Sequence, residues 1–147
     1  SLTPMKEVQL QTVSVGSAIP DFSITGLSSS VRASENLITE SVELVITIDD
    51  LAGVQTDGDS NKIDMSDYQI VLRSPKGTEN VLLTPFNAYQ SGYDMTDLKL
   101  ISHAFYGEVS SGDWTLTVRD LDNSTNNRIS HPGEGKLVDW SLKIYGR

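Results

Sequence analysis

Residues 112–120 read Gly-Asp-Trp-Thr-Leu-Thr-Val-Arg-Asp, in which apolar and polar side chains alternate. Residues 135–146 show the same alternation and read Gly-Lys-Leu-Val-Asp-Trp-Ser-Leu-Lys-Ile-Tyr-Gly. A period of two with the apolar side chains on one side is typical of a half-buried antiparallel strand. The side chains predicted to form the buried faces are Trp114, Leu116 and Val118 in the first stretch, and Val138, Trp140, Leu142 and Ile144 in the second. We therefore expect Trp114 and Trp140 to anchor one core from two strands.

The same alternation predicts further strands upstream. Its longest run places four apolar residues on one face: Val42, Leu44, Ile46 and Ile48. A second run, residues 68–72, ends at Ser-Pro-Lys-Gly in residues 74–77. Pro in the second position and Gly in the fourth favour a type I turn there. Residues 81–83 are the predicted return strand, and residues 100–106 are a further strand candidate.

The remaining pattern indicates an all-β fold. Residues 22–24 are predicted to be a short extended piece, and the serine-rich residues 26–32 a loop. No window of about 12 residues keeps the apolar spacing of a helix. About eight short strands separated by turn signals predict a two-sheet β-sandwich, for which a jelly roll is one arrangement. Because no break in composition divides the chain, we expect a single domain over residues 1–147.

Composition excludes several classes of function. The chain has 11 Lys and Arg against 20 Asp and Glu, a net charge of −9, and so lacks the basic surface that nucleic acids require. The same charge disfavours anionic membrane surfaces. No apolar run approaches the roughly 18 residues of a membrane-spanning helix, so we expect no membrane insertion. The absence of cysteine fits a reducing cytosol, and it equally fits an extracellular bacterial protein stabilised by its core or by calcium.

Five fragments, in order, resemble one known family. Three of them are Ile-Pro-Asp at residues 19–21, Asp-Tyr-Gln-Ile-Val-Leu-Arg-Ser-Pro-Lys-Gly-Thr at residues 67–78, and Phe-Tyr-Gly-Glu at residues 105–108. The other two are the tryptophan-containing stretches quoted above. Together they resemble the P domain (P/Homo B domain) that follows the catalytic domain in kexin- and furin-like proprotein convertases and in many bacterial secreted proteases. The resemblance covers residues 19–146.

This resemblance implies a function. It implies a non-catalytic accessory domain of a secreted subtilisin-like serine endopeptidase of bacterial type, packed on the catalytic domain of the same polypeptide and stabilising it. Because the family also follows metallopeptidase domains in some bacterial proteins, the type of partner active site stays open. A signal peptide, which the first six residues do not resemble, is then expected at the start of a longer precursor.

The acidic segment that precedes the second fragment departs from the family pattern. About 16 extra residues, Leu51 to Ser66, intervene here. In and beside them, oxygen-bearing side chains recur around a glycine: Asp57, Asp59, Asn61, Asp64 and Asp67. Flexible loops of this kind bind Ca²⁺, which takes 6–8 oxygen ligands. The segment is a candidate calcium site, and the alternative is a solvated acidic hairpin tip.

Catalytic signatures are missing from the sequence. Serine hydrolases need a nucleophile, a base and an orienting carboxylate, and only His103 and His131 could act as the base. The chain has no Gly-x-Ser-x-Gly, and two distant histidines without cysteine do not form a zinc site. We therefore expect the chain by itself not to be an enzyme, and its parent polypeptide to be a serine-type endopeptidase.

A function of a different class remains open. The chain could be a stand-alone module that binds carbohydrate or protein through a sandwich face or its loop tips. Trp114 and Trp140 are predicted to be buried, so a carbohydrate site would have to use the exposed aromatic residues Tyr89, Tyr93 and Tyr106.

Overall fold

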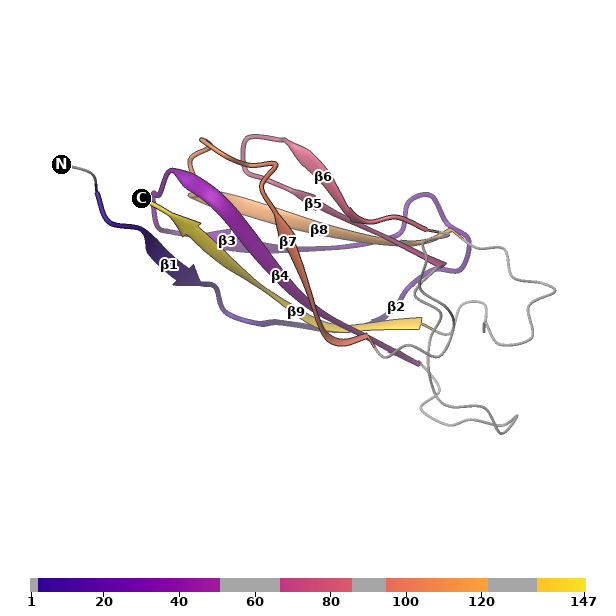
Figure 1. Cartoon of the computed structure of the whole chain (residues 1–147). Helices are drawn as coiled ribbons and strands as arrows, with labels where there is room; N and C mark the ends of the chain where they lie inside the picture. Colours follow the sequence, from indigo (N-terminus) through magenta and orange to yellow (C-terminus); the bar gives the residue numbers. More distant parts are fainter. Residues whose placement is uncertain (1–2, 51–66, 86–94, 122–134) are drawn as a thin grey trace.

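The computed structural model describes residues 3–50, 67–85, 95–121 and 135–147, and within these ranges every element is a β-strand (Figure 1). The strands are β1 (Lys6–Gln9), β2 (Val13–Ala18), β3 (Leu27–Ala33), β4 (Thr39–Asp50), β5 (Tyr68–Arg73), β6 (Glu79–Leu83), β7 (Met95–Ser102), β8 (Gly112–Asp120) and β9 (Gly135–Gly146). One sheet has the order β1-β9-β4-β7, with β2 also paired to β9, and the other has the order β3-β8-β5-β6. All pairings are antiparallel. The predicted two-sheet β-sandwich is therefore confirmed.

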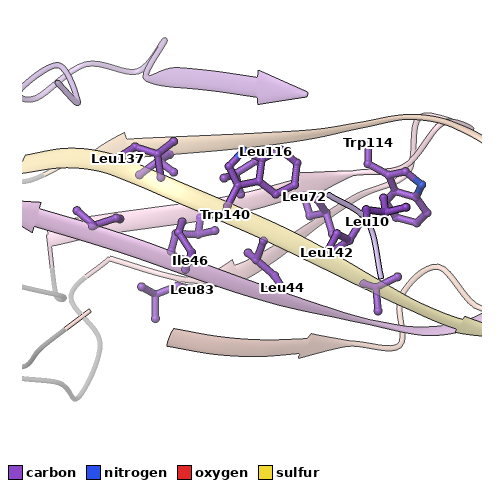
Figure 2. Close-up of a cluster of buried hydrophobic side chains, with 14 of the residues drawn as sticks. Leu10, Leu44, Ile46, Leu72, Leu83, Trp114, Leu116, Leu137, Trp140 and Leu142 are labelled. Atoms are coloured by element: carbon purple, nitrogen blue, oxygen red, sulfur yellow. The ribbon is translucent and has the colours of Figure 1, made fainter. Parts of the chain in front are cut away.

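The core lies between the two sheets and contains both tryptophans (Figure 2). Trp114 on β8 and Trp140 on β9 are each 0% exposed, and they come from opposite sheets. Each indole N–H donates a hydrogen bond: Trp114 to the Ser110 carbonyl at 2.9 Å, and Trp140 to Ser29 Oγ at 2.8 Å. Two large apolar side chains are thus buried without leaving a donor unsatisfied.

The predicted buried face of β9 needs one correction. Val138 is only half-buried, whereas Leu137 is completely buried. In the pairing with β4, Thr47 faces Asp139 but Ile48 faces Leu137, so β9 has one extra residue at this point. Such a β-bulge shifts the alternation by one residue, which a strict period of two does not anticipate.

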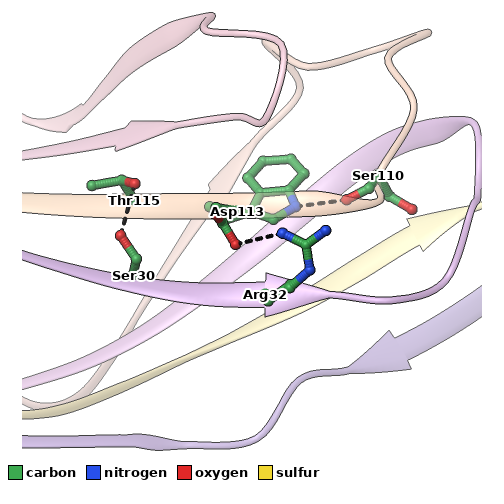
Figure 3. Close-up of polar contacts among 6 residues, drawn as sticks. Ser30, Arg32, Ser110, Asp113 and Thr115 are labelled. Carbon is green, nitrogen blue, oxygen red and sulfur yellow. Dashed lines mark hydrogen bonds and ion pairs between the residues drawn. The ribbon is translucent and has the colours of Figure 1, made fainter.

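The segment before β4 also differs from the prediction. The predicted loop at residues 26–32 is β3, which pairs with β8 over its whole length. Ser28 and Ser30 are exposed and bond threonines of β8: Ser28 Oγ lies 3.0 Å from Thr117 Oγ1, and Ser30 Oγ lies 2.9 Å from Thr115 Oγ1 (Figure 3). Ser29, between them, accepts the hydrogen bond from Trp140. Cross-strand hydroxyl pairs of this kind stabilise a sheet, although serine-rich composition is otherwise typical of loops.

Two further predictions of extended structure are wrong in part. Residues 22–24 are not extended: residues 21–22 form a turn, in which Phe22 has a φ of 45° in the left-handed region, and residues 24–25 form a bend. The strand predicted at residues 100–106 is β7, which ends at Ser102, and a turn at residues 104–107 follows it.

We expect Trp140→Ala to destabilise the isolated chain by roughly 3–5 kcal/mol, because it removes a fully buried indole and leaves a cavity. This loss approaches the whole stability of a marginal domain, about 5 kcal/mol. Urea unfolding followed by circular dichroism measures it. The matched control is Tyr106→Ala, since Tyr106 is 74% exposed and an exposed substitution should change stability by about 0.5 kcal/mol or less. Equal midpoints for the two variants would contradict the assigned core.

Candidate interaction surface

Residues of three separate sequence fragments meet at the end of the sandwich where β5 ends and β8 begins. Ser74, which is buried at the end of β5, donates a hydrogen bond from Oγ to Glu108 Oε1 at 2.6 Å. Gly77 N–H donates to the Ser74 carbonyl at 2.9 Å, as in a β-turn. Gly112, the first residue of β8, has a φ of 124°, and a Cβ there would lie 2.7 Å from Pro75 Cβ. The fragments are therefore close-packed against one another.

The connection between β7 and β8 is held rigidly at this end. The rings of Phe105 and Trp114 contact edge to face, with centroids 5.2 Å apart and an angle of 83° between their planes. Ser110 ties the connection to the residues before β4, because its Oγ donates to the Glu35 carbonyl at 2.6 Å and accepts from Leu37 N–H at 2.9 Å. The turn at residues 104–107 is thus anchored through Phe105, which packs in the core, and through Ser110, which is bonded to the residues before β4.

This rigid support exposes apolar side chains. Ile38 is 50% exposed, Tyr106 74% and Val109 46%, and Ile38 pairs with Val109 in an isolated β-bridge. A hollow of about 470 Å³ is lined by Ile38, Thr39, Glu40, Tyr106, Gly107 and Arg147. A second hollow, of about 430 Å³, shares Gly107 with the first and is lined by Pro75, Lys76, Gly107, Glu108, Val109 and Ser111. We call Ile38, Tyr106, Val109 and these two hollows the Tyr106 surface.

Both ends of the described chain lie at the end of the sandwich where β8 begins (Figure 1), and Arg147 lines one of the two hollows. Arg147 exchanges main-chain hydrogen bonds of 2.8 and 3.1 Å with Ile38. Its side chain donates from Nε to Glu40 Oε1 at 2.9 Å and from Nη1 to the Thr3 carbonyl at 2.8 Å. Thr3 and Arg147 therefore lie together at the edge of this surface.

The outer face of the β3-β8-β5-β6 sheet has a different character. Besides the serine–threonine pairs, Arg32 Nη1 and Asp113 Oδ1 form an ion pair at 3.1 Å (Figure 3). Both side chains are mostly exposed, so this pair adds little stability. Over β3 and β8 the face is polar, and the hydroxyl groups of these pairs are hydrogen-bonded to one another. Over β6 it also exposes the apolar side chain of Val81.

The structure places only some of the residues singled out from the sequence. Tyr106 is exposed as predicted, and His103 is exposed directly after β7. Asp67 is buried, and its carbonyl accepts a hydrogen bond from Leu121 N–H at 2.9 Å. The other residues lie outside the described ranges: Asp57, Asp59, Asn61, Asp64, Tyr89, Tyr93 and His131. Within those ranges, no three His, Cys, Asp or Glu side chains are grouped as a metal would require, and no helix could cross a bilayer.

Sequence reasoning missed two members of the Tyr106 surface. Ile38 and Val109 lie outside the named strands and contact each other only because the segments 35–39 and 105–110 pair. An isolated apolar residue in an irregular segment carries no periodic signal, so nothing in the sequence could have brought them together.

The chain is a β-sandwich module. Residues of the sequence fragments quoted above pack in its core and against one another at one end of the sandwich. A family model described as the proprotein convertase P-domain matches residues 51–144, more than half of the chain. The chain belongs to this family, and the resemblance inferred from its sequence fragments is confirmed.

The relatives, which include bacterial serine proteases and animal proprotein convertases, are much longer than this chain. The Aeromonas extracellular serine protease of Aeromonas sobria is 29% identical over 99% of this chain, which spans 26% of that protein. Proprotein convertase subtilisin/kexin type 6 of Homo sapiens is 36% identical over 54% of this chain, which spans 8% of that protein. The crystal structure of the Aeromonas sobria serine protease with the chaperone ORF2 superposes with a TM-score of 0.79 and 27% identity, over 99% of this chain and 28% of that one.

We expect Gly112→Ala to destabilise the chain by roughly 2–4 kcal/mol, because it adds a collision with Pro75 to the strain of a positive φ. Gly107→Ala is the matched control. Gly107 also has a positive φ, 83°, but a Cβ there meets nothing within 4 Å. Its cost should be that of the strain alone, about 1–2 kcal/mol. Thermal melting of both variants measures the difference, and equal losses would contradict the close packing at Gly112.

Proposed function

We propose that this chain is a single, non-catalytic accessory domain of a secreted, bacterial-type subtilisin-like serine endopeptidase. In this proposal it packs on the catalytic domain of the same polypeptide and stabilises it. The observation that carries the proposal is the match of 99% of this chain to about a quarter of an Aeromonas sobria protein named as an extracellular serine protease. The remaining three quarters of that protease are available for its other parts, including its catalytic domain.

The physical basis of such stabilisation is thermodynamic linkage. An interface that forms only between folded partners lowers the free energy of the folded state and not that of the unfolded state. Interfaces between domains of one chain bury about 600–1,500 Å². A rigid, close-packed sandwich suits this role, because little conformational freedom is lost when its surface is covered.

The chemistry of the described residues supports an accessory role. Serine protease catalysis needs a histidine in contact with a nucleophile and a carboxylate. The one histidine among the described residues, His103, is exposed beside the 104–107 turn, and its carbonyl accepts from Tyr106 N–H at 3.3 Å. The motif residues of the family serve packing instead, as the contacts of Ser74, Gly112 and Trp114 illustrate.

One observation favours a second candidate function. The exposed ring of Tyr106 borders a hollow that Glu40 and Arg147 also line. An aromatic ring beside charged hydrogen-bonding groups is an arrangement that binds carbohydrate as well as protein. A stand-alone binding module would use this hollow without any attached catalytic domain.

The accessory function predicts that the peptidase activity of the full-length polypeptide that contains this chain becomes less stable to heat when the chain is deleted. We expect the half-life of peptidase activity at a fixed elevated temperature to fall by about tenfold or more, which corresponds to about 1.4 kcal/mol of lost interaction. Thermal inactivation of the two proteins, assayed with casein, measures this ratio.

The isolated chain is the control for catalysis, and it should cleave neither casein nor dibasic peptides. Equal half-lives with and without the module would contradict the accessory function. A reading frame that encodes no protease at all would favour the binding module.

The calcium site remains a prediction, because four of its five candidate ligands lie outside the described residues. If the site exists, calcium at about one hundred times its Kd should stabilise the folded chain by about 2.7 kcal/mol. The melting temperature of the chain should then rise with millimolar calcium and fall with a chelator, and Asp59→Ala should abolish the response. The control is sodium at equal ionic strength, since screening alone depends mainly on ionic strength. A solvated acidic tip would respond equally to both salts.

A further inference from the structure

We propose that the Tyr106 surface is the face on which the protease domain of the same polypeptide docks. This inference rests on the proposed accessory function and specifies where on the sandwich the interface lies. Its occupant is a covalently attached, folded domain that presents apolar side chains to the two hollows.

The first argument is the exposure of apolar groups on a rigid support. Ile38, Tyr106 and Val109 form an exposed cluster, and clusters of this kind mark interaction sites more often than scattered apolar residues do. The backbone beneath them is fixed: Gly107 N–H donates to the Thr39 carbonyl and Thr39 N–H to the Glu108 carbonyl, both at 2.8 Å. Because these groups are ordered before docking, little entropy is lost when a partner covers them.

The second argument is the shape and charge of the surface. The two hollows that share Gly107 can each receive a side chain of a partner, and side chains inserted into such pockets carry most of the binding energy of an interface. Three charged side chains that line the hollows have partners: Arg147 pairs with Glu40, and Glu108 accepts a hydrogen bond from Ser74. Lys76 also lines the second hollow, and its long side chain can keep the ammonium group in water when the surface is covered. Covering the surface therefore does not bury an unpaired charge at these positions, which would oppose docking.

The third argument identifies the occupant. Thr3 and Arg147 lie at the edge of the Tyr106 surface, so a domain connected through either end by a short segment is held beside it. Such tethering raises the effective concentration to the millimolar range for short linkers. A free second copy of the chain has no such advantage.

A competing apolar surface lies at the other end of the sandwich. Phe22 is 59% exposed and Ile24 84%, and their turn is held by hydrogen bonds from Ser23 N–H to the Asp120 carbonyl and from Arg119 Nε to the Ile24 carbonyl. Asp120 and Gly112 are opposite ends of β8, about 25 Å apart at the usual strand rise. A domain tethered near Thr3 or Arg147 would have to reach along the whole sandwich, which makes this turn a matched control.

The test compares two double variants within the full-length polypeptide. Ile38→Ser with Tyr106→Ser changes the proposed docking face, and Phe22→Ser with Ile24→Ser changes the same kind of residues at the opposite end. We expect the first pair to shorten the half-life of peptidase activity by about fivefold to tenfold, equivalent to about 1–1.4 kcal/mol, and the second pair to leave it unchanged. Hydrogen exchange should also show slower exchange of amides 105–109 in the full-length polypeptide than in the isolated chain.

The outcomes separate the two proposals. If deletion of the module has no effect on half-life, the accessory function itself fails. If deletion shortens the half-life but only the Phe22 and Ile24 pair reproduces it, the accessory function stands and docking at the Tyr106 surface is wrong. Melting of the isolated variant chains identifies any loss of folding. If the isolated chain with Ile38→Ser and Tyr106→Ser is destabilised, the half-life of the Tyr106→Ser single variant and the exchange of amides 105–109 decide the outcome. Equal exchange in the isolated chain and in the full-length polypeptide would overturn the docking proposal.

Discussion

The structure depends on the burial of two tryptophans from opposite sheets in one core. Trp114 on β8 and Trp140 on β9 fill the space between the sheets, and each indole N–H has an acceptor. Burial of such large side chains supplies much of the free energy that offsets the ordering of long strands. The pairing of β4 with both β9 and β7 then positions the middle of its sheet. The packing of Phe105 on Trp114 connects this core to the turn at residues 104–107.

The family fragments have a physical role at one end of this core. Phe105 packs edge to face on Trp114, Ser74 bonds Glu108, and Gly112 leaves room for Pro75. These contacts fix a turn that carries Tyr106 on its outside. A single set of interactions therefore stabilises the domain and presents a surface.

The β-sandwich architecture by itself does not specify a function. Sandwiches of this architecture serve many purposes, and the structural match to a protease comes with 27% identity over 99% of this chain. What distinguishes this molecule is the position of the Tyr106 surface beside Thr3 and Arg147. The proposed stabilisation of an attached domain would require contact and tethering together, and the Tyr106 surface lies at the same end of the sandwich as Thr3 and Arg147.

The sequence by itself determined the fold class and the faces of the principal strands. Alternation is a local property, so the burial of Trp114 and Trp140 followed from residues within each strand. Tertiary structure alone decided the bulge beside Val138, the strand formed by serine-rich residues 27–33, and the contact of Ile38 with Val109. Each of these depends on hydrogen bonds to a strand or segment distant in sequence. A local pattern predicts which residues seek burial, but only the pairing of distant segments decides the register and the surface that remains exposed.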